Sequence, residues 1–128
     1  MPIVITAVIP PRATMSDAVL LTDVTAVVGL IMPGDWTPAV VTVQGSPFGV
    51  NFYDIYDGTA GKELLFNVKP RTLVMINPNR LRSCIAIKLR SGTAAAPVAQ
   101  LGARTFGIVV EGGEQLYPTP WDEEDNPA

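Results

Sequence analysis

The 128-residue chain contains no histidine and one cysteine, Cys84. The absence of histidine excludes a Ser-His-Asp or Cys-His catalytic arrangement, a His-ligated metal and an imidazole proton shuttle. A single cysteine supports neither a cysteine-based zinc site nor an intrachain disulfide. The nearest candidates for acid–base chemistry are Asp54 and Asp57, but Asp57 directly precedes Gly58 and is typical of a turn. We therefore expect no catalytic residues, no metal, no cofactor and no enzymatic activity.

Charge is also scarce. Charged residues make up 16% of the chain, against about a quarter in an average domain. The net charge of −3 and the pI near 4.7 argue against a nucleic-acid partner. No apolar run approaches the roughly 18 uninterrupted residues that a membrane-spanning helix requires, so we expect no membrane partner.

The chain is rich in apolar residues, at 48%, and in turn residues, with 11 glycines and 12 prolines. Short β-branched runs alternate with turns such as Pro33-Gly34-Asp35 and Asp57-Gly58. This pattern predicts strands near residues 3–9, 18–21, 26–32, 40–44, 49–56, 63–68, 72–76, 83–90 and 104–111. Many short strands at intervals of about ten residues are typical of an all-β sandwich or barrel.

The segment 83–90 shows the clearest alternation of the chain. Two sets of side chains are expected on opposite faces of this strand, namely Cys84, Ala86, Lys88 and Arg90 on one face and Ile85, Ile87 and Leu89 on the other. The pattern predicts a half-buried strand whose basic residues are directed outward.

The C-terminal part of the chain differs from the rest. Residues 111–128 carry six acidic side chains and no basic one, whereas residues 1–110 carry nine basic and six acidic side chains. We therefore expect a domain over residues 1–111 and an acidic C-terminal arm over residues 112–128. Within the domain, Met1–Pro11 is expected to contain a strand, with an N-terminal arm as the alternative.

The arm contains the run Tyr117-Pro118-Thr119-Pro120-Trp121, whose prolines exclude a helix or a central strand. We expect the arm to bind a neighbouring subunit, with Trp121 and Tyr117 as anchors. The carboxylates that would pair with basic groups of the partner are Asp122, Glu123, Glu124 and Asp125. The alternative is a solvated tail that aids solubility.

Two stretches carry a resemblance to a known group of proteins. The run Leu89–Gln100, LRSGTAAAPVAQ, followed by Arg104–Val110, RTFGIVV, resembles the C-terminal part of small virion structural proteins of tailed bacteriophages. The run Ile31–Gln44, with its proline-to-tryptophan turn, and the strand Phe52–Asp57 resemble upstream segments of the same proteins. The resemblance covers roughly residues 28–111.

The resemblance implies a jelly-roll-like antiparallel β-sandwich, here with extended N- and C-terminal arms. It implies a capsid decoration (cement) protein that binds the outer surface of the assembled head and stabilises contacts between subunits of the major capsid protein. A homotrimer, assembly in the host cytoplasm and a final location in the virion are also implied by the resemblance alone.

The loop around Arg90–Gln100 is a candidate contact segment, because its small residues permit close approach of a partner and because Arg90 and Arg104 can pair with acidic groups. The alternative is that Arg90 fastens its own loop. Two other functions stay open, a tail or baseplate protein and a carbohydrate-binding module for host attachment. The carbohydrate-binding module would use the aromatic cluster Phe48, Phe52, Tyr53 and Tyr56 to stack on sugar rings. The alternative is that these rings lie in the core or at a subunit contact.

Overall fold

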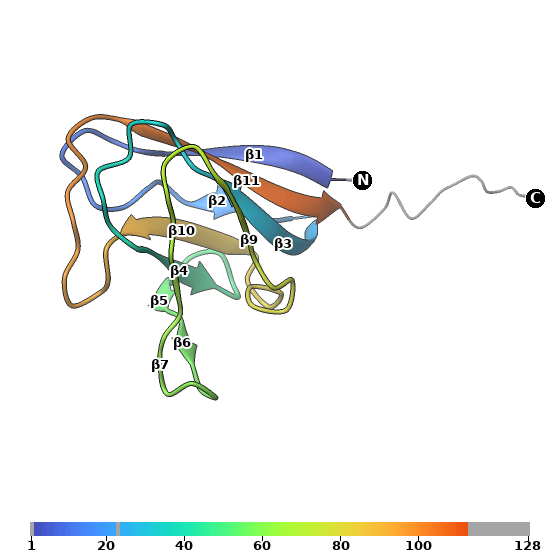
Figure 1. Ribbon diagram of the computed structural model, residues 1–128. Coiled ribbons are helices and arrows are strands. Elements are labelled where there is room, and N and C mark those ends of the chain that lie inside the picture. Colours follow the sequence, from blue (N-terminus) through green and yellow to red (C-terminus); the bar gives the residue numbers. More distant parts are fainter. Residues whose placement is uncertain (1, 23, 113–128) are drawn as a thin grey trace, which may run out of the picture.

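The computed structural model describes residues 2–22 and 24–112, and in this part of the chain it contains strands and connecting segments without a helix (Figure 1). The strands in chain order are β1 (Pro2–Ile9), β2 (Val19–Leu20), β3 (Val24–Ile31), β4 (Val41–Ser46), β5 (Tyr53–Asp54), β6 (Tyr56–Asp57), β7 (Lys62–Glu63), β8 (Leu65–Phe66), β9 (Leu73–Met75), β10 (Ala86–Ser91) and β11 (Arg104–Gly112). Among the described residues, no helix is long and apolar enough to cross a membrane.

The strands form two antiparallel sheets that face each other, and Figure 1 shows them as two layers. The first sheet has the order β1-β11-β3-β9. The second has the order β2-β10-β4-β5, with β8 also paired to β4, and the hairpin β6-β7 projects from it. The prediction of an all-β antiparallel sandwich is confirmed.

The first sheet is built on a long pairing between the two ends of the described chain. β1 pairs with β11 over its whole length, from Pro2 opposite Glu111 to Ile9 opposite Arg104. Both strands are rich in β-branched residues, which suit a pleated sheet. The chain around Ile3–Ile9 is therefore a strand of the domain in this structure.

The core lies between the sheets. From β11, Phe106, Ile108 and Val110 are directed inward and are at most 1% exposed. The ring of Trp36, from the turn after β3, packs edge-on against Phe106 with 5.3 Å between ring centroids. The indole N–H of Trp36 donates to the carbonyl of Ala39 at 3.1 Å, so its polar group is satisfied in the buried position.

As predicted, β10 directs Lys88 and Arg90 away from the core, because Ile87 and Leu89 belong to the core, but the expectation that this face is open to solvent is wrong. All residues of β10 except Lys88 are buried, and Arg90 is only 5% exposed. The reason is that Asp54 and Glu63, from the segment carrying β5–β8, contact the Arg90 guanidinium and cover it, and we call this segment the covering segment. Lys88 itself is partly covered, because its Nζ lies 4.5 Å from the ring centroid of Phe52.

The covering segment is less regular than the sequence indicates. The strands expected over 49–56 and 63–68 are each divided into two-residue strands, β5 and β6 and then β7 and β8. The hairpin turn expected at Asp57-Gly58 is present, since Asp57 of β6 pairs with Lys62 of β7 and Gly61 has a φ of +73°.

Candidate interaction surface

Arg90 fastens the covering segment to the second sheet. Its Nη2 contacts Glu63 Oε2 at 2.7 Å and Asp54 Oδ1 at 2.9 Å, and its Nε donates to Thr42 Oγ1 at 2.9 Å. The Glu63 carboxylate also accepts from the backbone N–H of Ala94, at 3.2 Å to Oε2. Arg90 therefore joins β10 and β4 to the covering segment, and Glu63 extends this contact to the loop after β10.

Arg104 has a similar position at the other end of that loop. Its Nε donates to Gln100 Oε1 at 3.0 Å, its Nη1 to Asp35 Oδ2 at 3.1 Å and its Nη2 to Thr37 Oγ1 at 3.3 Å. Gln100, with no exposed area, also donates through Nε2 to the carbonyl of Thr37 and to Ser91 Oγ. This network holds the 91–102 loop against the turn that carries Trp36.

The two arginines expected to contact a partner are thus both buried and both paired within the chain. This geometry favours the alternative in which Arg90 fastens its own surroundings, and a partner contact by Arg90 or Arg104 stays a prediction. The other expected partner-binding residues, namely Tyr117, Trp121, Asp122, Glu123, Glu124 and Asp125, lie outside the described residues.

The sequence did not indicate the surface that stands out most, which is the outer face of the first sheet. Cross-strand register places two rows of side chains on it. We call this surface the uncharged face, and its residues are Val4, Thr6 and Val8 of β1, Thr105, Gly107 and Val109 of β11, Gly29 and Ile31 of β3, and Leu73 and Met75 of β9. The larger apolar side chains remain open to solvent, with Val4 54%, Leu73 57% and Met75 71% exposed.

No residue of the uncharged face carries a charge. The four strands together contain two charged residues, of which Arg104 is buried and Glu111 lies on the same outer side as Val109, at the end of β11 beyond the uncharged face. The outer face of the second sheet differs, because Lys88 and Arg90 lie there with Asp54. The low charge of the chain is therefore distributed unequally between its two outer faces.

Two glycines make the uncharged face continuous. A Cβ on Gly107 would lie 3.0 Å from both Ile31 Cδ1 and Val4 Cγ1, and a Cβ on Gly29 would lie 3.2 Å from Leu73 Cδ1. The apolar side chains of neighbouring strands thus lean over the glycines and leave no open space between rows. The four-stranded sheet, at about 4.8 Å per strand and about 25 Å long, gives the face an area of roughly 400–500 Å². This is as large as the largest apolar patch of a typical monomer, which is often functional.

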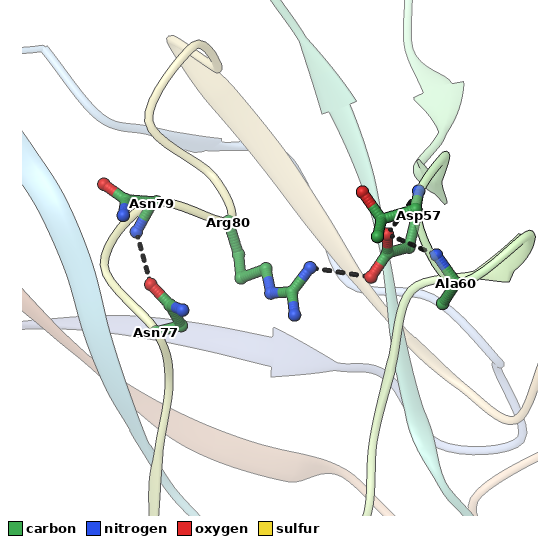
Figure 2. Close-up of a pocket in the computed structure, with 6 residues that line it drawn as sticks. Asp57, Ala60, Asn77, Asn79 and Arg80 are labelled. Atoms are coloured by element: carbon green, nitrogen blue, oxygen red, sulfur yellow. Dashed lines mark hydrogen bonds and ion pairs between the residues drawn. The ribbon is translucent and has the colours of Figure 1, made fainter.

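A polar hollow, separate from the uncharged face, lies between the β6-β7 hairpin and the turn after β9 (Figure 2). Its volume is about 460 Å³, and its lining consists of Asp57, Thr59, Ala60, Asn77, Asn79 and Arg80. Asp57 and Arg80 form an ion pair of 2.7 Å across it, and Asn77 Oδ1 accepts from the backbone N–H of Asn79 at 3.0 Å. No group of three potential metal ligands is present among the described residues.

Hydrogen bonds and cations shift the pKa of two carboxyls on the covering segment, Asp57 in the hollow and Asp54 beside Arg90. The backbone N–H of Ala60, which donates to Asp57 Oδ1 at 3.0 Å, and the Arg80 guanidinium lower the pKa of Asp57. The Gln44 amide, at 3.1 Å, and then Arg90 lower the pKa of Asp54. Burial raises the pKa of the Cys84 thiol, which favours the unreactive protonated form.

Comparison with known proteins identifies no relative of this chain. No family model, no curated protein and no solved structure matches this chain. The resemblance to virion proteins therefore depends on the motifs around Ile31–Gln44 and Leu89–Val110, and the candidate surface depends on the geometry described above.

Replacing Arg90 by methionine is expected to destabilise the fold by about 2 kcal/mol, because Asp54 and Glu63 lose their shared cation while keeping partial access to water. Arg82→Met is the matched control, since Arg82 is exposed and surface substitutions of this kind usually change stability by less than about 0.5 kcal/mol. Urea denaturation measures both variants. Equal losses in the two variants would contradict the fastening role of Arg90.

The shifted carboxyls predict an acid-sensitive fold. Because the folded-state pKa of Asp57 lies below its unfolded value near 4, the unfolded state binds more protons in acid. The stabilising contribution of the Asp57 carboxylate is complete above its unfolded-state pKa and is lost as the pH falls through its folded-state pKa. Asp57→Asn keeps the turn acceptor, so we expect its free energy of unfolding to fall less steeply than that of the wild type between about pH 5 and pH 2. Identical slopes in urea titrations at these pH values would show that Asp57 is not responsible.

Proposed function

We propose that this protein is a non-enzymatic structural component of a multi-copy particle, and specifically a decoration protein on the outside of a bacteriophage head. The observation that carries this proposal is the uncharged face. A largely apolar outer face gains free energy when a second layer covers it, and within the described residues the chain supplies a layer only on the inner side of this sheet.

The order of the strands supports the proposal. The chain crosses from one sheet to the other at each step from β1 to β4, and again from β9 to β11, which gives the strand orders β1-β11-β3-β9 and β2-β10-β4-β5. A four-stranded and a five-stranded sheet linked by these crossings are compatible with a jelly roll, an architecture that is common in viral capsid domains. This architecture also occurs in lectins and cupins, so the strand order supports the resemblance without identifying a function by itself.

The proposed mechanism is mechanical. Burying roughly 400 Å² of apolar surface at about 25 cal/mol per Å² gives about 10 kcal/mol before the costs of association, which consume most of that gain. A single copy would then bind weakly, and many copies on one lattice would add through their high effective concentration. Because the copies bind only the assembled lattice, they stabilise it by mass action.

A carbohydrate-binding module is the second candidate, and a specific observation favours it. Tyr53 and Tyr56 are 57% and 65% exposed, and Tyr56 lies on β6 beside the polar hollow. The Tyr56 hydroxyl donates to the carbonyl of Gly61, which orients the ring beside the hairpin. An exposed ring beside amide and carboxylate groups is able to stack on a sugar and bind its hydroxyls. A tail or baseplate protein is favoured by no separate observation in this structure.

The head hypothesis is tested on particles. We expect quantitative mass spectrometry of purified virions to find hundreds of copies of this protein per particle, on the head fraction, because decoration follows the capsid lattice. Heads assembled without it are expected to rupture at lower temperature, measured by release of DNA to an intercalating dye. A few copies confined to the tail fraction would contradict a head location. Binding of the purified protein to a glycan array, reduced by Tyr56→Ala, would instead support the carbohydrate module.

A further inference from the structure

The uncharged face has the wrong size for a whole domain as its partner. A stable interface buries about 800 Å² on each side, and this face offers roughly half of that. Its width is about 19 Å for the four strands. An extended segment of six residues is about 20 Å long, so the face matches one extended peptide laid across the strands.

The chain contains such a peptide outside the described residues. The run Leu116–Trp121 has six residues, no charge, and apolar or aromatic side chains at three positions. Its two prolines have no N–H for a strand ladder, which disfavours addition to the open edges of β1 or β9 and favours packing on the face of the sheet. We propose that the uncharged face binds the Leu116–Trp121 segment of a second copy of this chain. The inference rests on the proposed function and makes a neighbouring copy on the lattice, rather than the shell beneath it, the partner that covers the face.

The charges around the face give this docking a direction. Asp122–Asp125 follow Trp121 immediately, as four consecutive acidic residues. Lys69 and Arg71 precede the edge strand β9 and Arg82 follows it, and none of the three has an ion pair with a carboxylate among the described residues. A segment that crosses from β1 towards β9 brings its acidic end to the β9 edge, where Arg71 precedes the strand by two residues, and such a charge pair would raise the rate of encounter.

The position of Gly112 favours a second copy over the same chain. β11 ends there, at the edge of the molecule and directed away from it (Figure 1). Three residues separate Gly112 from Leu116. A reversal of direction takes a four-residue turn and would leave no residues to climb the roughly 10 Å from the plane of the sheet to a layer above it. A neighbouring copy requires no reversal.

The test is a complementation experiment with two full-length variants. Trp121→Ala removes the anchor and keeps the face, whereas Met75→Glu places a charge on the face and keeps the anchor. We expect the wild type to self-associate in sedimentation velocity and each variant alone to associate at least about 30-fold more weakly. An equimolar mixture of the two is expected to form a 1:1 pair, because the intact segment of one variant fits the intact face of the other.

Controls separate this contact from general effects of charge. Leu20→Glu adds the same charge to an exposed apolar position on β2, at the edge of the opposite sheet, and is expected to associate like the wild type. Val4→Glu repeats the face substitution on β1 and is used if Met75→Glu fails a circular dichroism test of folding. Added salt is expected to weaken the association through the acidic run.

Three outcomes would overturn the proposal. A wild type that stays monomeric up to millimolar concentration excludes docking on a second copy. A monomer in which Met75→Glu shifts the fluorescence of Trp121 shows docking within the same chain. Failure of the mixture to form a pair, with both variants folded, shows that the segment and the face are not partners. None of these measurements uses phage heads. Failure of the docking between copies is therefore distinguishable from failure of the proposed head location.

Discussion

Exposed apolar area costs free energy in proportion to its size, so a β-sheet that is largely apolar on both sides gains stability when both sides are covered. The first sheet of this protein meets that condition on its inner side, where Phe106, Ile108 and Val110 are almost fully buried. Its outer side presents Val4, Leu73 and Met75 to solvent. The proposed assembly follows from this difference between the two sides of the sheet.

The rest of the structure uses its few charges to keep the opposite side rigid. Arg90 joins β10 to the covering segment through Asp54 and Glu63, and Arg104 with Gln100 holds the 91–102 loop. These contacts fix loops on a chain that has no disulfide and whose only cysteine is half-buried. The polar hollow likewise pairs its two charged side chains, Asp57 and Arg80, with each other.

Much of the fold was predictable from local chemistry. The long β-branched strands and the Asp57-Gly58 turn were placed correctly, because each depends on residues adjacent in sequence. Arg90 was expected to be exposed and is buried, since alternation in β10 gives the direction of the side chain but does not reveal that Asp54 and Glu63 of a distant segment cover it. The uncharged face was missed for a related reason. β1 is apolar at nearly every position, so no alternation marks an outer side, and only the register with β11 and β3 brings Val4, Gly107 and Ile31 together.

The rate at which peroxide oxidises Met75 tests the central claim most directly, because this side chain lies on the uncharged face and is 71% exposed in the isolated chain. Met32, at 3% exposure, serves as the buried reference in the same molecule. Peptide mass spectrometry follows both residues in the native particle and in the dispersed Trp121→Ala variant. If the face is covered in the assembly, Met75 is oxidised at least about tenfold more slowly in the particle than in the dispersed variant. Equal rates for Met75 in the two samples would contradict the account.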